Sequence, residues 1–287
     1  MSKLSLQTLA LWLLIAGNLS ASLSDVMVKL LDGSIHPNQY IFIRQLISVI
    51  VIYPFWRKEC VESRQLHAPW LNLFRAHLVI IGSGCMVVAI THMTLANANA
   101  VFYAAPLLML PISVLMLKEM PPRSKILATI IGFIGVLIVL RPSQFHWAAI
   151  FALSTATTLA LFNVSARKLP QKQTMISTLF WTSALSVPLS AVLALAYWQP
   201  ISFVQLSLIA ASAIFILLYN GLAVLAYRKA PAGEIGVAEY SGLVFVTLFG
   251  VWWFNEVPDW LTAIGILCII VPLLPIKRGG RHSSRQS

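Results

Sequence analysis

Four polar residues recur on one face of the first apolar segment. Asn18, Ser22, Asp25 and Lys29 follow one another at spacings of four, three and four residues, which places them on one side of an α-helix. A polar stripe in an otherwise apolar segment has to face protein or water rather than lipid. Asp25 and Lys29 are one turn apart, so we expect them to pair along the helix.

A cation in the next apolar segment extends this cluster. Arg44 lies just over a turn into that segment, at a depth from which it can reach Asp25. Arginine is suited to bidentate recognition of carboxylates and phosphates. One interpretation is a charged substrate cavity, with Asp25 as a proton-sensitive carboxylate and Arg44 and Lys29 as anion-binding groups. The alternative is a structural ion-pair cluster that ties the two segments together, with Lys29 reaching outward.

A second carboxylate lies deep in the ninth apolar segment. Glu239 is about two turns from the start of that segment, where a desolvated acid suits a proton carrier. The alternative is a neutral acid that is hydrogen-bonded to a neighbouring helix. Aromatic rings within the segments could stack on a planar or cationic substrate, and an amide in the sixth segment could line the cavity. These further candidates are Tyr103, Tyr240, Trp181 and Asn163.

These residues lie in a chain made largely of membrane-length apolar segments. Hydrophobic residues make up 59% of the 287 residues and charged residues 10%, with a mean hydropathy of +0.83. A helix of about 20 apolar residues spans a bilayer. We predict ten such helices: 6–30, 39–56, 71–92, 95–117, 126–140, 146–166, 174–197, 203–227, 232–254 and 259–276.

The basic residues predict how these helices are oriented. With a cytoplasmic N-terminus, nearly all the remaining Lys and Arg are assigned to the cytoplasmic connections, including Arg75 at the edge of the third segment, and Arg141 alone falls in the others. This distribution follows the positive-inside rule and predicts ten spans with both termini cytoplasmic. The formal charge of +11 is therefore interpreted as a topology signal beside the lipid bilayer rather than as a nucleic-acid surface.

The sequence argues against several classes of protein. The three cysteines have neither disulfide nor metal spacing, and we expect no metal and no cofactor. No zinc-helix, paired-aspartate or Gly-rich nucleotide motif is present, so we do not expect an enzyme or an ATP-driven pump. The first segment continues past the usual length of a signal peptide and is interpreted as a retained helix.

The two halves of the chain resemble each other. Aligning Glu119 with Glu256 also aligns Pro121 with Pro258. Residues 1–141 and 142–287 would then each hold five helices, and an odd number turns the second repeat upside down relative to the first. Inverted repeats around a central site are typical of secondary transporters. Each glutamate stands before a short helix, where its charge would favour the helix N-terminus.

These features resemble the ten-helix EamA-like branch of the drug/metabolite transporter superfamily. The resemblance rests on Arg44, on Pro106, on the Leu-Lys-Glu sequence that ends at Glu119, on the matching Glu256 and on the paired halves. This chain departs from the family's pattern at Leu243, which stands where the second half would usually repeat the proline of Pro106. The resemblance implies a proton- or gradient-driven carrier of small organic metabolites, often an exporter, with a cavity between the halves.

The sequence as a whole therefore predicts an all-α integral protein of the inner (plasma) membrane. We expect a secondary active transporter that exports a small polar metabolite, such as an amino acid, by alternating access. The alternatives are an uptake carrier for a cofactor- or nucleoside-like compound of the riboflavin or S-adenosylmethionine type, and a non-transporting scaffold. The expected partners are the substrate, the bilayer, a coupling proton and a second copy packed through Gly132, Gly135 and Gly265, with no nucleic acid.

Overall fold

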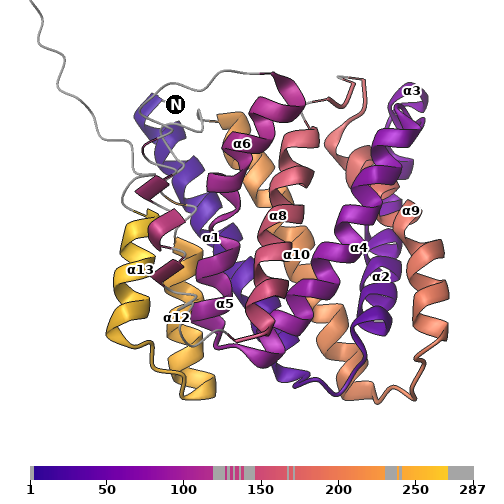
Figure 1. Ribbon diagram of the computed structural model, residues 1–287. Coiled ribbons are helices and arrows are strands. Elements are labelled where there is room, and N and C mark those ends of the chain that lie inside the picture. The colour runs from indigo at the N-terminus through magenta and orange to yellow at the C-terminus, as the bar shows by residue number, and fades with distance from the viewer. Residues whose placement is uncertain are drawn as a thin grey trace, which may run out of the picture.

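The computed structural model of the chain is built from helices. It describes residues 3–118, 146–229 and 241–270 apart from 167 and 171, together with residue 238 and scattered positions between 127 and 138, and no strand occurs among these. The helices are α1 (Lys3–Leu30), α2 (Pro37–Arg57), α3 (Val61–Arg64), α4 (Pro69–His92), α5 (Leu95–Phe102), α6 (Ala105–Leu117), α8 (Ala148–Ala166), α9 (Met175–Leu195), α10 (Phe203–Lys229), α12 (Ser241–Phe254) and α13 (Trp260–Ile270) (Figure 1).

Seven helical stretches in the described part of the chain are long and apolar enough to cross a membrane. They run over Leu6–Leu30, Pro37–Arg57, Pro69–His92, Leu95–Met116, Ala148–Ala166, Met175–Leu195 and Phe203–Ala223. Each matches a predicted segment to within a few residues. The helix α12 is apolar but shorter. The all-helical membrane fold is therefore confirmed, while the count of ten spans and the cytoplasmic termini stay predictions.

Local side chains determine where several helices begin. Thr174 accepts a hydrogen bond from the backbone N–H of Ser177 at the start of α9, and Thr94 accepts one from Asn97 at the start of α5. These side chains satisfy N–H groups that have no partner within the helix. At the end of α6, Lys118 adopts a left-handed conformation with φ of 57°, which stops the helix.

The predicted fourth span is two helices rather than one. The helix α5 ends at Phe102, and α6 begins at Ala105 after a turn at Tyr103 and Ala104. Pro106 stands in the first turn of α6, where a residue without a backbone N–H is tolerated. The chain is therefore broken just before Pro106 rather than bent at the proline itself.

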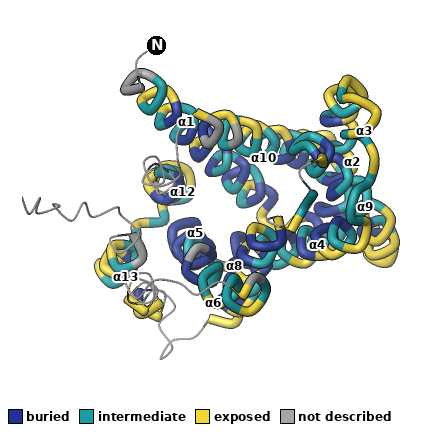
Figure 2. Tube along the Cα trace, turned by 90° about the horizontal axis from the view of Figure 1, so that it is seen from above, coloured by how far each residue is buried: buried dark blue, intermediate teal, exposed yellow. Residues whose placement is uncertain are grey.

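Helices from the two parts of the chain pack against each other. The closest neighbours are α1 with α10, α2 with α9 and α4 with α8, and the residues buried in these contacts face the inside of the bundle (Figure 2). On α8, alanines at spacings of four are fully buried, among them Ala152, Ala156 and Ala160. Small side chains let helices approach closely where lipid gives no hydrophobic drive.

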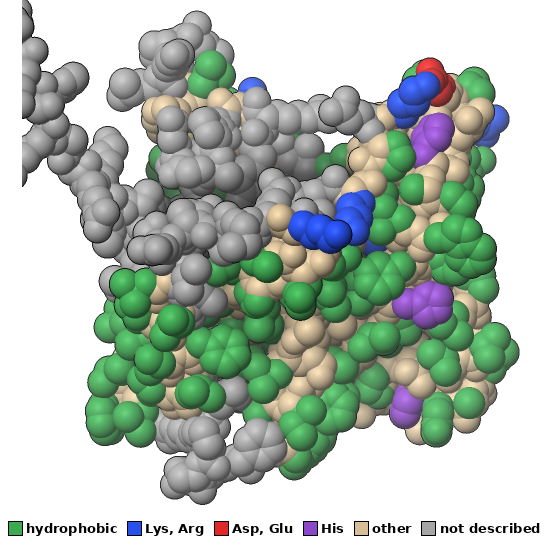
Figure 3. Space-filling model, turned by 45° about the horizontal axis from the view of Figure 1, so that its top comes forward, with side chains coloured by type: hydrophobic (Ala, Val, Ile, Leu, Met, Phe, Trp, Pro, Cys, Tyr) green, Lys and Arg blue, Asp and Glu red, His purple; other side chains and the backbone are tan. Residues whose placement is uncertain are grey.

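The two ends of the bundle carry different connections. The start of α1 and the helix α3 lie at one end, and the turns that follow α1, α9 and α12 lie at the other (Figure 1). We call these the α3 end and the Glu256 end. Acidic and basic side chains gather at the α3 end, whereas the visible side of the bundle is mostly hydrophobic (Figure 3). By the charge pattern, the α3 end is expected to face the cytoplasm.

One basic residue does not lie where the charge pattern suggests. Arg75, counted with the cytoplasmic connections, lies inside α4 and is 3% exposed. Its guanidinium donates hydrogen bonds to the Phe162 carbonyl and to Ser165 Oγ near the end of α8. A cation is favourable at a helix C-terminus, so the assignment of Arg75 to a connection is wrong and its role is to join α4 to α8.

Candidate substrate site

Asp25 lies at the centre of a group of polar side chains from several helices. Its carboxyl is half-buried on α1, lies beside the side chain of Asn99 on α5, and attracts the Arg44 guanidinium of α2. Asp25 and Arg44 do not form an ion pair, since the described part of the chain has none that includes either residue. Two opposite charges thus face a common region without direct contact.

Arg44 is held in place by neutral groups. Its Nη1 donates a hydrogen bond to Ser83 Oγ of α4 at 3.1 Å, and its guanidinium lies 5.9 Å from the centre of the Tyr40 ring. Its Nε is buried and has no hydrogen-bond partner within the described residues. Since a buried donor without a partner is costly, Arg44 has hydrogen-bonding capacity left for a ligand.

A chain of hydroxyl groups supports Arg44 from behind. The Tyr40 hydroxyl lies 2.8 Å from Ser212 Oγ of α10, and Ser212 Oγ lies 2.8 Å from Ser24 Oγ of α1. All three side chains are nearly or fully buried. Because Tyr40 and Arg44 are also one turn apart on α2, this network fixes the orientation of the ring beside the guanidinium.

The N-terminal part of the polar stripe joins α1 to the end of α5, to Ala238 and to the start of α12. Asn18 Nδ2 donates to the Ala238 carbonyl at 3.0 Å, and Ser22 Oγ donates to the Gly242 carbonyl at 3.2 Å. A Cβ atom on Gly242 would overlap the Tyr103 hydroxyl. Gly242 is therefore required for the Tyr103 ring to lie across α12, and Asn18, Ser22 and Tyr103 come together as one junction.

Lys29 belongs to a different contact from the one predicted. Its Nζ lies 2.8 Å from Glu256 Oε1 and donates to the Met93 carbonyl at 2.6 Å. The other Glu256 oxygen accepts the backbone N–H of Leu95, the first residue of α5, at 2.7 Å. The expected pair of Lys29 with Asp25 is thus replaced by an ion pair across the bundle.

Glu256 also binds the N-terminus of a different helix from the one expected. The sequence places it at the start of the short helix that follows it, but Asp259 Oδ1 accepts the Thr262 N–H there. The Glu256 carboxylate instead accepts the Leu95 N–H at the start of α5. Glu256 was predicted to bind a helix N-terminus, and it does so. The helix is α5, however, which is distant from Glu256 in the chain.

Two candidates lie away from Asp25. Trp181 Nε1 donates to the Arg64 carbonyl at 2.9 Å, next to α3, and its ring meets that of Trp56 edge-on at 5.9 Å. Asn163 is exposed near the end of α8. Neither residue shares a contact with the Asp25 group. The other predicted candidates, Glu119, Glu239 and Tyr240, lie outside the described residues.

The site also contains residues that the sequence did not single out. Tyr40, Ser83, Ser24 and Ser212 all contact Arg44 or support it. The only available signal was that Tyr40 precedes Arg44 by one turn, because serines are common in membrane helices. In the described part of the chain, no group of three or more His, Cys, Asp or Glu residues could hold a metal ion.

These features define the class of protein. The chain is a multi-pass helical membrane protein with opposite charges held between its helices, and charges placed in this way mark substrate or ion pathways. A family model for the EamA-like transporter family matches residues 8–141 and again residues 146–276. The chain belongs to the EamA-like transporter family, and it is a multi-pass protein of the inner membrane.

Related proteins carry several different substrates. The chain is 27% identical over 258 residues to an S-adenosylmethionine uptake transporter of Rickettsia prowazekii, covering 88% of this chain and 86% of that one. It is 24% identical to a pseudopaline exporter of Pseudomonas aeruginosa, covering 93% and 95%. It is 25% identical to a riboflavin transporter of Vibrio cholerae, covering 96% and 95%.

A solved structure shares the fold. A crystal structure of another protein superimposes on this chain with a TM-score of 0.58 at 17% sequence identity, covering 95% of this chain and 96% of the other. The family and the relatives together make the chain a transporter of small metabolites rather than an enzyme.

Proposed function

We propose that this protein transports a zwitterionic metabolite of the amino-acid type by alternating access, and that the net direction is export. The substrate carboxylate would bind Arg44 and its amino group would bind Asp25. The observation that carries this proposal is that Asp25 and Arg44 attract each other but form no ion pair within the described residues. A zwitterion can bridge such a gap and satisfy both charges at once.

The surroundings of Arg44 support this assignment. Arginine recognises a carboxylate through two parallel hydrogen bonds when its plane is fixed. Ser83 and Tyr40 hold the guanidinium from two sides, and the buried Nε has no other described partner. The bound carboxylate would therefore meet an arginine that is already oriented, which reduces the entropy cost of binding.

A coupling proton is the second part of the proposal. Asp25 is the acidic member of the site and is half-buried beside Asn99. A proton on Asp25 would cancel the charge that holds the substrate amino group and would favour its release. Proton uptake from one side and release on the other would then drive export.

Uptake of a cofactor with an amino-acid head group is the second candidate. The relative from Rickettsia prowazekii is an S-adenosylmethionine uptake transporter, and S-adenosylmethionine carries a carboxylate and an amino group on one carbon. The same two residues would bind that head group. The gradients across the membrane, rather than the site, would determine the direction.

Metabolite profiling combined with flux measurements tests the proposal. Cells that overproduce the wild type, Arg44→Ala or Arg57→Ala would be compared for metabolites in the cells and in the spent medium. Arg57 is an exposed arginine at the end of the same helix, so Arg57→Ala is the matched control. A compound enriched outside only with the wild type and Arg57→Ala identifies an exported substrate.

Proteoliposomes then measure the contribution of Arg44. With the identified compound, or with labelled S-adenosylmethionine, Arg44→Ala is expected to lower transport efficiency about ten- to a hundredfold, since a hydrogen bond to a charged group contributes about 1.5–3 kcal/mol. Full transport by Arg44→Ala, with the protein present in the membrane, would refute the assignment of Arg44. Transport restricted to compounds without a carboxylate would refute the substrate class.

A further inference from the structure

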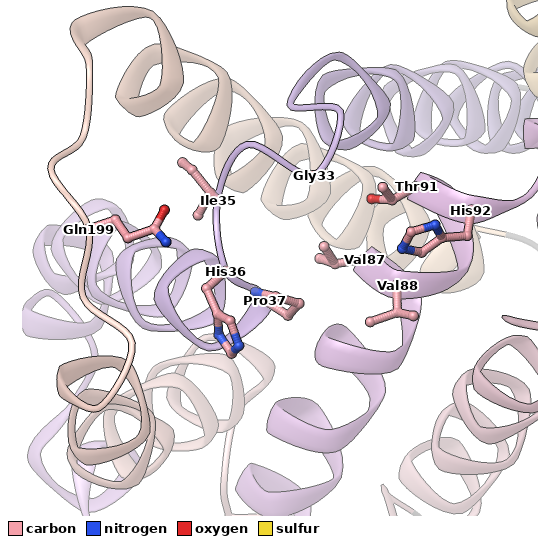
Figure 4. A pocket seen from close by; sticks show the side chains of 9 residues that line it. All are labelled: Gly33, Ile35, His36, Pro37, Val87, Val88, Thr91, His92 and Gln199. Atoms are coloured by element: carbon pink, nitrogen blue, oxygen red, sulfur yellow. The ribbon is translucent and has the colours of Figure 1, made fainter.

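A cavity of about 210 Å³ opens at the Glu256 end between α2 and α4. It is lined by the turn between α1 and α2, by the last two turns of α4 and by Gln199, which follows α9. In Figure 4, Thr91 and His92 lie on one side of it and Gln199 and His36 on the other. Its volume is below the range of about 300–1,000 Å³ typical of drug-sized ligands, so it suits a small molecule.

The walls of the cavity combine an apolar floor with polar groups. Val87 and Val88 supply apolar surface from α4. Within the described part of the chain, the side chains of Thr91, His92 and Gln199 form no hydrogen bond, and the His92 ring lies 4.7 Å from the Trp147 ring. None of the nine lining residues is acidic. The polar groups can therefore donate hydrogen bonds to a carboxylate while the valines contact a short side chain.

The groups on the side of the cavity formed by His36 and Gln199 are fixed in place. His36 Nδ1 accepts the backbone N–H of Asn38, and its ring stacks on Tyr197 with the centroids 4.2 Å apart, which leaves Nε2 available as a donor. The Gln199 backbone is held by both ends of the Gln39 carboxamide. This wall is therefore organised before any ligand binds.

The cavity lies on the same helix faces as Arg44. On α2, Pro37, Ile41 and Arg44 follow one another at spacings of four and three, so they share one face. On α4, Ser83 lies one turn before Val87. Between the two levels, Ile41 packs against Gly84, whose added Cβ would be 3.2 Å from Ile41 Cδ1. One layer of side chains thus separates the cavity from Arg44, which is about 10 Å further along α2.

We propose that this cavity is a second binding site for small amino acids, on the route between the Glu256 end and Arg44. The carboxylate binds to the donors of His36, Thr91 and Gln199, and the side chain lies over Val87 and Val88. The site is distinct from the Arg44 site because the Ile41–Gly84 layer separates them. The identity of its ligand rests on the proposed function.

Histidine-selective NMR of the purified full chain in detergent tests this proposal. The chain has six histidines, and His36→Gln and His92→Gln assign the two signals of interest. Titration with L-alanine, L-serine and L-valine is expected to shift the His36 and His92 signals together, with saturation, for at least one of them. The absence of a saturable shift with all three amino acids would overturn the proposal.

Two variants of α4 show whether the shift reports binding in the cavity. Val88→Trp fills the cavity and is expected to raise the apparent Kd at least tenfold. Ile81→Trp adds similar bulk to the same helix at a position that is 52% exposed, and it is expected to leave the Kd unchanged. Equal effects of the two variants would contradict binding in the cavity.

Arg44→Ala separates this inference from the proposed function. If the cavity is a site of its own, the two histidine signals still shift in Arg44→Ala. Loss of the shifts in that variant would mean that the histidines only sense binding at Arg44, and this would overturn the second site. Conversely, intact histidine shifts together with full transport by Arg44→Ala would refute the proposed role of Arg44 and leave the second site standing.

Discussion

Asp25 is a carboxylate that contacts an amide rather than a cation. Its polar neighbour is Asn99, and Arg44 acts on it only through the attraction of charges. A carboxylate that is not neutralised by an ion pair can gain or lose a proton as its surroundings change. This property separates Asp25 from Glu256, whose charge is compensated by Lys29 at 2.8 Å.

Replacing Asp25 and Glu239, the two acids predicted to lie deep in the membrane, tests the proton step. Asp25→Asn and Glu239→Gln keep the size of each side chain, so we expect normal amounts of protein in the membrane and reduced transport. If the acid carries the coupling proton, the remaining flux loses its dependence on pH. The measurement is flux in proteoliposomes with an imposed pH gradient. Normal flux with unchanged pH dependence in both variants would reject the carboxylate mechanism.

The contact between Gly242 and Tyr103 gives a prediction about stability. Gly242→Ala places a methyl group on the Tyr103 hydroxyl, and overpacking of this kind costs about 1–3 kcal/mol. We expect a lower unfolding temperature in detergent for Gly242→Ala and a partial recovery when Tyr103→Phe removes the hydroxyl. Gly221, which has nothing near its Cβ position, provides the control Gly221→Ala, so equal losses at both glycines would count against this contact.

At the scale of the helices, Glu256 joins three segments at one end of the bundle. One carboxylate holds Lys29 at the end of α1 and the N–H of Leu95 at the start of α5, while its own backbone N–H bonds to Gly250 of α12 at 2.9 Å. The Lys29 and Glu256 side chains are only 13% and 15% exposed. Movement of these helices relative to each other at this end would have to break the pair.

A double-mutant cycle measures this ion pair. Glu256→Gln leaves Lys29 without its counter-charge, and breaking a buried pair costs about 3–5 kcal/mol. Removing both charges, with Lys29→Met and Glu256→Gln together, is expected to restore part of the lost thermal stability in detergent. Additive losses in the double variant would show that the two charges do not stabilise the fold through each other.

The helices themselves could be predicted because an apolar run of bilayer length leaves few alternatives. The break before Pro106 was less predictable, since Tyr103 and Ala104 form the turn while the proline stands in the next helix. The partner of Lys29 could not be predicted from spacing. Asp25 is its neighbour along the helix, but Glu256 is brought to it by the packing of distant segments.

The candidate site was predictable in part. A charged residue in an apolar segment is conspicuous, so Asp25 and Arg44 could be found. The serines around them are not conspicuous, because Ser24, Ser83 and Ser212 become partners only once three other helices lie beside α2. The contacts of Trp181 with Trp56 and with the Arg64 carbonyl could not be predicted from spacing, and its role in stacking on the substrate stays a prediction.

For the whole molecule, Cys60 offers a test of orientation. It is an exposed thiol at the α3 end, and hydrogen bonds from the Ser63 side chain and backbone lower its pKa. A lower pKa means more thiolate at a given pH, so labelling with a maleimide should be fast near neutral pH. Ser63→Ala is expected to move the labelling curve to higher pH.

The same thiol distinguishes the two orientations of the chain. With the predicted cytoplasmic α3 end, a membrane-impermeant maleimide should label Cys60 in inside-out vesicles but not in intact cells. The control is Cys60→Ser, which leaves only the two half-buried cysteines, Cys85 and Cys268. Labelling of Cys60 in intact cells would show that the α3 end faces the outside, opposite to the predicted orientation.

The pairing of α1 with α10 also has a consequence for how the protein is made. The helix α1 leaves the ribosome first, but its main neighbour begins only at Phe203. At about 5–20 residues per second, α1 has to wait on the order of ten seconds or more in the bilayer. During that time Ser24 has no Ser212 to contact, and Asn18 and Ser22 lack their partners Ala238 and Gly242. A nascent chain that stalls before α10 would therefore present a polar helix face to lipid, a feature that membrane quality-control proteases could recognise.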